Sequence, residues 1–352
     1  MHYVLSSKNK EKWQKELKDC GVTDLYFELD YCLLYTQLGD GEPYLFVYEQ
    51  AGEKIVYPFL KRELSSLPFV DKNEKYFDII TPYGYGGPLG SLSKEMVEGF
   101  RKAFEEYCKQ EKIITEFVRF NPLIQNQVHH ETCMEVLHIR DTVYIDLEQN
   151  EDHFFKNLHK NHRRNTVKAI KNGLTTRILQ GTDAVAEIPT FLELYYQTMD
   201  KNNASEYYYF PSNYFHQLFK HFPNNSMITI VYNQETPIAA AIFFYQGEFL
   251  HYHLGGSNQD YMYLGANNLL FYQATLWGMK QRFKKLHLGG GYSGDDSLFQ
   301  YKKRFNSQGI LDFYIGKKIH NEEKYNNLIT SWKEYYAKKE YNPNFFPVYR
   351  QQ

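Results

Sequence analysis

Apolar and polar residues alternate through the first half of the chain in a pattern that predicts three strands, a helix and a fourth strand. Two alternating runs flank the turn at 50–53. After Ser93, a residue type favoured at helix N-caps, apolar side chains recur at the helical spacing of Phe100, Phe104 and Tyr107. The strands predicted by this pattern lie at 44–48, 54–60, 77–81 and 113–120.

The second half of the chain repeats this order of elements. Two alternating runs flank the turn at 233–235, and a helix with an apolar stripe at Leu269, Tyr272 and Leu276 precedes the last strand of the repeat. The predicted elements are strands at 227–232, 237–245, 249–254 and 284–288 and a helix at 265–282.

Three strands, a helix and a strand is the order in which an acetyltransferase-type fold builds its donor site. A chain of 352 residues has room for roughly two domains. We therefore expect an α+β protein with mixed sheets, built from two tandem acetyltransferase-like domains. A strand at 141–147 gives way to a charged helix near Glu148, so we place the domains at 1–148 and 149–352.

A strongly basic helix is predicted at 151–172. At 100° per residue its cations gather on one side, and no acidic residue follows Asp152 that could neutralise them at i,i+4 spacing. A solvated surface helix is the ordinary interpretation of such a run. The missing acidic partners favour a polyanion-binding face, formed by Lys156, Lys160, Arg163, Arg164, Lys168 and Lys171.

Composition limits the classes of function. The net charge of −2 gives no global attraction for nucleic acid, and 43% hydrophobic residues exclude a disordered chain. Four widely spaced cysteines favour a reducing compartment, and the N-terminal residues lack the apolar segment of a signal peptide. We therefore expect a cytoplasmic protein without a transmembrane segment, for which peripheral membrane association stays open.

Two further motifs are interpreted as structural. The run Gly289-Gly290-Gly291-Tyr292-Ser293-Gly294 satisfies G-x-G-x-x-G, but too few residues follow it for a dinucleotide-binding sheet, so we expect a loop that lets a substrate approach the backbone. The histidine pairs at 251/253 and 159/162 have no evident third ligand, so we expect no metal site. The sequence contains no recognisable motif of a hydrolase triad or a kinase loop.

Two segments carry candidate transfer chemistry. Gly265, Asn267 and Asn268 open a helix whose N–H groups could hold a phosphate, although Met262 stands where a coenzyme A loop usually has a basic residue. Lys302 follows the glycine loop beside Tyr301, where a fixed ammonium could stabilise an acyl-transfer oxyanion.

The chain resembles the Fem family of aminoacyl-tRNA-dependent transferases, within the wider set of Fem-like acetyltransferase (GNAT) domains. The similarity covers most of the chain, and the order of its segments is more specific than any one of them. They are Pro82-Tyr83-Gly84-Tyr85-Gly86-Gly87-Pro88, Lys160-Asn161-His162-Arg163-Arg164-Asn165, 198–215, Tyr252-His253-Leu254-Gly255-Gly256-Ser257, Asn267-Asn268-Leu269-Leu270 and Phe299-Gln300-Tyr301-Lys302-Lys303-Arg304-Phe305.

The resemblance implies an acceptor-binding first domain and a donor and catalytic second domain, each with an acyl-CoA N-acyltransferase-like fold. It implies catalytic roles for Lys302 and Tyr301. Acceptor contacts would come from Tyr85, Lys201, Tyr208 and Tyr252, and donor or phosphate contacts from Lys160, Arg163, Arg164, Gly265, Asn267 and Asn268.

The chain departs from the family pattern at Lys201. Family members often have arginine here, and lysine cannot reproduce the bidentate clamp of a guanidinium on phosphate. There is also no long charged insertion that would form the helical arm of some members. The acceptor therefore stays open between a cell-wall precursor and a related small molecule, lipid-linked or bound to a nucleotide-sugar.

Three hypotheses of function follow. The first is transfer of an aminoacyl group from aminoacyl-tRNA, as co-substrate, to an amine, with no tightly bound cofactor. The second is an acetyl-CoA-dependent N- or O-acetyltransferase acting on a nucleotide-sugar or polysaccharide precursor. The third is a non-catalytic glycan- or RNA-binding module on a degenerate transferase fold.

Overall fold

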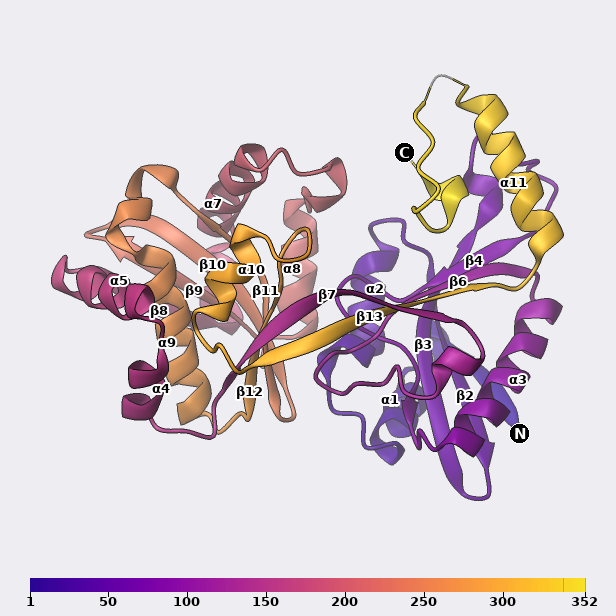
Figure 1. The fold of residues 1–352 in the computed structure, drawn as a ribbon, viewed down its shortest axis with the longest axis horizontal. Coiled ribbons are helices and arrows are strands. Elements are labelled where there is room, and N and C mark those ends of the chain that lie inside the picture. Colours follow the sequence, from indigo (N-terminus) through magenta and orange to yellow (C-terminus); the bar gives the residue numbers. More distant parts are fainter. Residues whose placement is uncertain (338, 352) are drawn as a thin grey trace. The chain divides into compact units, whose positions relative to one another are not determined.

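The structure is a computed structural model that describes residues 1–337 and 339–351. Its contacts divide the chain into two compact units, both visible in Figure 1. Unit 1 comprises residues 1–22, 26–139 and 313–352, and unit 2 comprises residues 23–25 and 140–312.

Unit 1 is a mixed sheet with strand order β1-β2-β3-β4-β6-β13, and β5 pairs with β3. Only β4 and β6 run parallel in this set. Its strands are β1 (His2–Ser6), β2 (Glu42–Gln50), β3 (Glu53–Glu63), β4 (Phe77–Ile80), β5 (Leu89–Gly90), β6 (Ile113–Arg119) and β13 (Ile310–Ile319), and its helices are α1 (Lys10–Asp19), α2 (Leu29–Thr36), α3 (Lys94–Gln110) and α11 (Glu322–Tyr335).

Unit 2 has the strand order β7-β12-β11-β10-β9-β8, in which only β11 and β12 run parallel. Its strands are β7 (Glu135–Asp146), β8 (Thr175–Gln180), β9 (Ser226–Asn233), β10 (Thr236–Gln246), β11 (Phe249–Ser257) and β12 (Lys285–Gly290). Its helices are α4 (Glu151–Asn157), α5 (Lys160–Lys171), α6 (Gly181–Ala186), α7 (Ile188–Lys201), α8 (Ser212–His221), α9 (Ala266–Lys280) and α10 (Ser297–Lys303).

Short 3-10 turns complete both units: η1 (Ser7–Asn9), η2 (Leu25–Phe27), η3 (Leu64–Ser66), η4 (His130–Thr132), η5 (Glu206–Tyr208), η6 (Gln259–Leu264) and η7 (Val348–Arg350).

The predicted internal repeat is present. In unit 1, the hairpin β2-β3 and strand β4 are followed by helix α3 and a strand, β6, that pairs in parallel with β4. In unit 2, β9-β10-β11, helix α9 and the parallel strand β12 have the same relations. The hydroxyl oxygen of Ser93 accepts a hydrogen bond from the Met96 amide (3.3 Å), so the predicted cap of α3 forms.

Each repeat borrows its closing strand from the other half of the sequence. Residues 142–146 of β7 pair antiparallel with β12, inside unit 2. Residues 315–319 of β13 pair antiparallel with β6, inside unit 1. The units therefore differ from the predicted domains 1–148 and 149–352, because residues 313–352 belong with unit 1 and the strand before Glu148 belongs with unit 2.

The helix predicted at 151–172 is two helices. Leu158 adopts an extended conformation (φ −55°, ψ 140°) between α4 and α5, and the His159 ring then caps α5 by accepting from the Asn161 amide (Nδ1, 3.2 Å). The bend frees the His159 amide, which donates to the Arg304 carbonyl oxygen (3.0 Å), while Phe154, Leu158 and Ala169 are buried in the core of unit 2.

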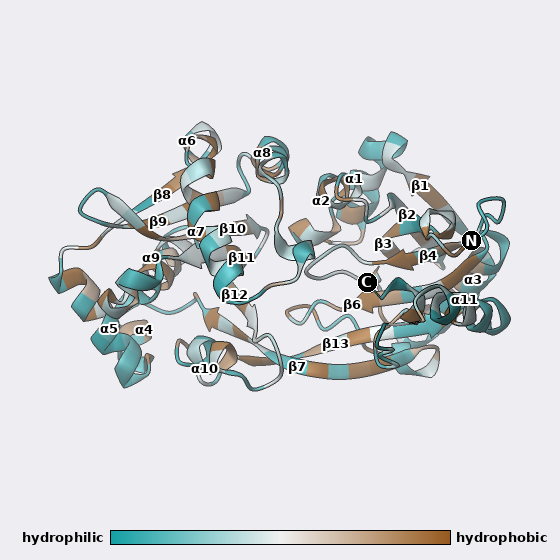
Figure 2. Ribbon diagram, turned by 90° about the horizontal axis from the view of Figure 1, so that it is seen from above, coloured by the Kyte–Doolittle hydropathy of each residue, from teal (hydrophilic) through white to brown (hydrophobic). Residues whose placement is uncertain are grey.

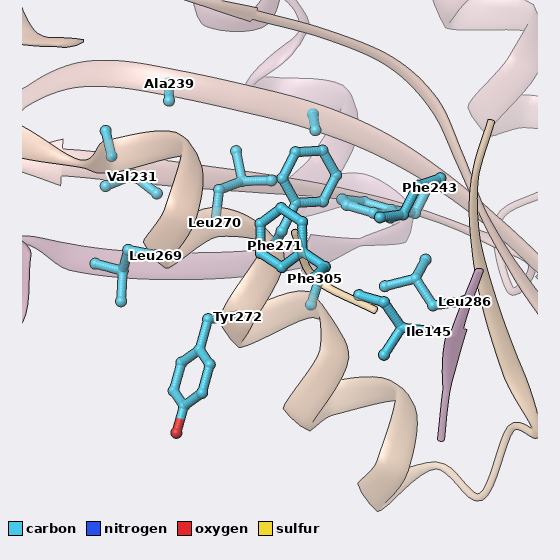
Figure 3. Packing of buried hydrophobic residues seen from close by; sticks show 14 of the residues in the cluster. Ile145, Val231, Ala239, Phe243, Leu269, Leu270, Phe271, Tyr272, Leu286 and Phe305 are labelled. Atoms are coloured by element: carbon cyan, nitrogen blue, oxygen red, sulfur yellow. The ribbon is translucent and has the colours of Figure 1, made fainter. Parts of the chain in front are cut away.

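Each unit has its own apolar core. In Figure 2 the strands β3 and β4 of unit 1 are mostly brown, as expected for strands covered by apolar side chains. In unit 2, α9 is buried on several sides, and Figure 3 shows Phe271 and Phe305 next to each other near Leu286 and Ile145. Phe305 follows α10, so this core anchors the segment that carries Lys302.

Candidate active site

The segment between β12 and α10 forms a tight loop that fixes Lys302. Lys302 Nζ donates to the Gly290 carbonyl oxygen at the end of β12 (2.8 Å). Gly290 is required here, because a Cβ would lie 2.6 Å from the Asp141 carbonyl oxygen. Asp296 caps α10 by accepting from the Phe299 amide (2.8 Å) and also from the Ser293 amide (2.8 Å).

Lys302 is a buried cation without a carboxylate partner. Lys302 is only 6% exposed, and no carboxylate oxygen of the described residues lies within 4.0 Å of its Nζ. Burial lowers the pKa of Lys302 to about 7, while Asp296 acts in the opposite direction and Arg140 adds to the lowering. Lys302 can therefore hold or release a proton near neutral pH.

The ring of Tyr252 lies beside the Lys302 nitrogen, with its centroid 5.3 Å away. Burial raises the pKa of Tyr252 to about 12, so its hydroxyl keeps its proton at neutral pH. Tyr252 and Lys302 are two predicted site residues that the structure brings together.

Tyr301 is a packing residue in the structure. Its ring lies 4.8 Å from the His162 ring and 5.5 Å from the Phe305 ring, measured between centroids. Its hydroxyl is buried without a hydrogen-bond partner among the described residues, and burial raises its pKa. The backbone of Tyr301 also binds α5, through its carbonyl oxygen and His162 Nε2 (2.9 Å).

Helix α5 thus packs directly on the segment that carries Lys302. The His159 amide donates to the Arg304 carbonyl oxygen (3.0 Å), and the His162 and Phe305 rings lie 4.3 Å apart. Burial lowers the pKa of His162 to about 4, so this contact is uncharged at neutral pH. The opposite face of α5 exposes Lys160, Arg164, Lys168 and Lys171, with Arg163 partly exposed.

The predicted donor residues Gly265, Asn267 and Asn268 lie together at the start of α9. Gly265 adopts a left-handed conformation (φ +80°), and a Cβ on it would lie 2.6 Å from the Asn165 carbonyl oxygen of α5. Asn165 Nδ2 donates to Asn268 Oδ1 (3.3 Å), and Asn267 Nδ2 donates to Ser257 Oγ (3.2 Å). Helix α5 therefore covers this helix start closely.

The other predicted acceptor residues are spread over both units. In unit 1, Tyr85 packs edge-on against Tyr26 (5.3 Å between centroids). In unit 2, Lys201 is exposed at the end of α7, with its Nζ 3.5 Å from Met262 Sδ, and the Tyr208 carbonyl oxygen accepts from the Tyr195 hydroxyl (2.6 Å). Their role in acceptor binding stays a prediction.

A row of buried polar residues, Asp24, His251 and His287, leads to Lys302 and was not predicted from the sequence. His251 Nε2 lies 3.2 Å from Asp24 Oδ2, and the His251 and His287 rings are 5.9 Å apart on paired positions of β11 and β12. Burial lowers the pKa of His287 well below its ordinary value, and the charges of His251 and Lys302 lower it further. The one available signal was His287, a titratable residue between Leu286 and Leu288 in an apolar strand.

Both units combine the hairpin, helix and parallel strand of an acyl-CoA N-acyltransferase-like (GNAT-like) fold, so the molecule is a tandem GNAT-like protein, as predicted. A family model named FemAB_like, described as peptidoglycan biosynthesis/recognition, matches residues 89–298. The chain belongs to this family, which confirms the resemblance.

Solved structures share the fold at low sequence identity. FemX has a TM-score of 0.68 at 13% identity, over 92% of this chain and 99% of FemX. L-PGS from Bacillus licheniformis has a TM-score of 0.56 at 10% identity, over 91% of this chain and 95% of that one. A tandem GNAT protein from the clavulanic acid biosynthesis pathway has a TM-score of 0.50 at 8% identity, over 91% and 98%.

None of the curated proteins compared with the chain matches it significantly. Among the described residues, no helix combines the length and apolarity required to cross a bilayer.

Proposed function

We propose that the protein is an acyltransferase that moves an aminoacyl group from aminoacyl-tRNA to an amine of a cell-wall precursor or a related small molecule. One observation carries the proposal: the unpaired, buried Lys302 lies on the segment against which the basic helix α5 packs. Family membership and the fold shared with FemX support it.

The cations on the outer face of α5 suit a long polyanion. Lys160, Arg164, Lys168 and Lys171 are exposed, and phosphate contacts of this kind give RNA its affinity without reading sequence. We infer that this face holds the tRNA backbone while its acylated end reaches Lys302. Because aminoacyl-tRNA is made in the cytoplasm, we place the reaction there.

In the proposed reaction the acceptor's neutral amine attacks the ester carbonyl, and a C–N bond forms. Lys302, as the ammonium, donates to the oxyanion of the tetrahedral intermediate. The ester C–O bond then breaks. The amine nitrogen loses one proton and the departing ribose oxygen gains one, so a lysine whose pKa is near 7 can take part in that exchange.

Other residues have supporting roles in this proposal. The Lys302 nitrogen lies over the Tyr252 ring, which bounds the site, and Tyr301 positions Lys302 through its packing on His162 and Phe305. Asp296 is committed to backbone amides, which together with the other amides of its loop lower its pKa although burial alone would raise it, so we assign it the cap of α10. Tyr85, Lys201 and Tyr208 stay proposed acceptor contacts.

An acetyl-CoA-dependent acetyltransferase is the second candidate. The left-handed Gly265 at the start of α9 and the buried Asn268 amide, whose Nδ2 has no partner among the described residues, favour a phosphate at this helix start. The close cover by Asn165 speaks against it, since the carbonyl oxygen of Asn165 faces the same turn.

Incubation with tRNA carrying a labelled amino acid tests the first proposal. We expect label to move to amine-bearing sugar-peptide precursors, and charged tRNA to raise the melting temperature because a ligand of the folded state stabilises it by mass action. Uncharged tRNA with free amino acid is the control. Stabilisation and transfer with acetyl-CoA alone would establish the second candidate, and salt-dependent RNA binding without any transfer would reduce the protein to a binding module.

A further inference from the structure

Unit 2 has a pocket at the edge of its sheet opposite Lys302. The pocket gathers residues from the end of β8, the start of α6, the loop before β9, the end of β10 and the end of α9, and Phe283 two residues before β12. Lys302 binds the carbonyl oxygen at the other end of β12. The six residues of β12 span roughly 20 Å, so the pocket is separate from the candidate active site.

The floor of this pocket is aromatic. Tyr245, Trp277 and Phe283 pack together, with ring centroids 5.0 Å apart for Tyr245–Trp277, 5.6 Å for Tyr245–Phe283 and 5.9 Å for Trp277–Phe283. Trp277 and Phe283 are only half-buried, so parts of both rings face the pocket. Such a floor offers a flat apolar surface to the C–H face of a ligand.

The rim of the pocket is made of amides. Gln180, Asn224 and Gln281 are exposed around the floor, and each amide offers both a hydrogen-bond donor and an acceptor. Gln180 already donates to the Tyr245 hydroxyl, which fixes the edge of the floor. Within the described residues, the side chains of Asn224 and Gln281 make no hydrogen bond and are free for a ligand.

The pocket has no charged side chain in its lining. A phosphorylated ligand such as a nucleotide would find no cation there to neutralise it. A ligand with apolar C–H faces and hydroxyl or acetamido edges matches both the rings and the amides. The volume of about 440 Å³ falls within the range of about 300–1,000 Å³ typical of small-molecule sites.

From this combination we propose that the pocket is a binding site for a neutral saccharide, stacked on Trp277 and held by Asn224 and Gln281 at the rim. The saccharide is anchored there rather than transformed, because the candidate active site lies at the opposite edge of the sheet. The proposal does not depend on aminoacyl transfer and holds for any reaction at Lys302.

The tryptophans of this chain make the test direct. Of the three, Trp13 and Trp332 are 0% and 1% exposed, so Trp277 is the one whose fluorescence a pocket ligand can reach. Titration of the full chain with chitotriose and cellotriose should give a saturable change in emission. Chitotriose carries acetamido groups and cellotriose does not, so the pair shows whether the amides select them.

Variants of the rim decide between pocket binding and unspecific effects. Asn224→Ala and Gln281→Ala should each weaken saccharide binding by about 3- to 10-fold, the amount expected for one lost hydrogen bond. Both side chains are exposed, so the fold should be unaffected, as circular dichroism can verify. Gln308→Ala, an exposed amide elsewhere in unit 2, is the matched control and should bind like the parent. Trp277→Phe should abolish the emission change while calorimetry still detects binding.

Three outcomes would overturn the proposal. One is the absence of any saturable response to either trisaccharide at tens of millimolar. Another is binding that Asn224→Ala and Gln281→Ala leave unchanged. The third is a response to uridine or adenosine with none to the saccharides, which would assign the aromatic floor to a nucleobase.

Discussion

Both units bury a cation, but the two cations are in opposite situations. In unit 1, Arg101 donates to both carboxylate oxygens of Glu116 (2.8 and 3.0 Å) and to His130 Nδ1 (2.9 Å). Burial alone would raise the pKa of Glu116, yet Arg101 and His320 lower it to about 2. In unit 2, Lys302 donates to one carbonyl oxygen, and the residues that the structure describes offer it no carboxylate within 4.0 Å.

The different partners of Arg101 and Lys302 suit the two cations to different roles, one structural and one chemical. A guanidinium with all its partners in place is fixed in one charge state and one geometry, which suits a core. An ammonium with a single neutral partner keeps two protons available and titrates near neutral pH. The repeated fold thus contains one buried cation paired with a carboxylate and one that, among the described residues, has no carboxylate partner, and it is the second that we propose acts on a substrate.

Removing the cation of unit 1 should have the largest effect. We expect Arg101→Met to lower the free energy of unfolding by about 3–5 kcal/mol, because the buried Glu116 carboxylate loses its guanidinium partner and keeps only His320. Denaturant titration measures this. The double variant Arg101→Met/Glu116→Gln should recover part of the loss. A cost below about 1 kcal/mol would mean that the pair is not structural.

Removing the cation of unit 2 should act on turnover instead. Lys302→Ala is expected to lower kcat by about 100- to 1,000-fold, the range for one lost oxyanion donor, with no loss of folding stability. Transfer assays and denaturant titration on the same preparations check both parts. Lys303→Ala, its neighbour, is the control. Full turnover in Lys302→Ala would remove the oxyanion role.

The surfaces of the two units can be compared in the same way. Replacing Lys160, Arg163 and Arg164 of α5 by glutamine should weaken RNA binding and make its logarithmic salt dependence shallower by about 2–3. The same number of glutamines on α3 of unit 1, at Lys94, Lys102 and Lys109, should change neither. Filter binding at several salt concentrations measures both slopes. Equal losses of RNA affinity in the α5 and α3 variants would show that the cations of α5 do not form a specific RNA-binding face.

The smallest effect concerns the pH profile. The Lys302 ammonium is lost as pH rises through about 7, so kcat should fall above that pH. Asp24→Asn removes a buried carboxylate that lies 3.2 Å from His251 Nε2, in the row that reaches Lys302 through His287. We expect it to shift this limb to lower pH by about one unit, equivalent to about 1.4 kcal/mol. His253→Gln, two residues from His251 on the same strand, should leave the limb in place. If Asp24→Asn leaves this limb of the pH profile unchanged, the row of Asp24, His251 and His287 has no electrostatic effect on the pKa of Lys302.

The local elements were predictable from the sequence, since alternation, helical spacing and an N-cap at Ser93 act over a few residues, whereas the catalytic role of Lys302 stays a prediction. The bend at Leu158 was not predictable, because no glycine or proline marks it and the His159 amide donates to the carbonyl oxygen of Arg304, a residue far away in sequence. The polar row was not predictable either. Asp24 and His251 are far apart in sequence, and no short-range pattern brings such residues together.

The exchange of closing strands sets the order in which the chain can mature during synthesis. When β6 leaves the ribosome, the strand that will cover its edge has not yet been made, and β13 supplies it only after all of unit 2 has emerged. Until then the nascent protein presents an open sheet edge, the kind of surface that invites pairing with other chains. Unit 1 therefore completes its sheet only after β13 has been synthesised, so a chain that stops before Ile310 would keep the edge of β6 open.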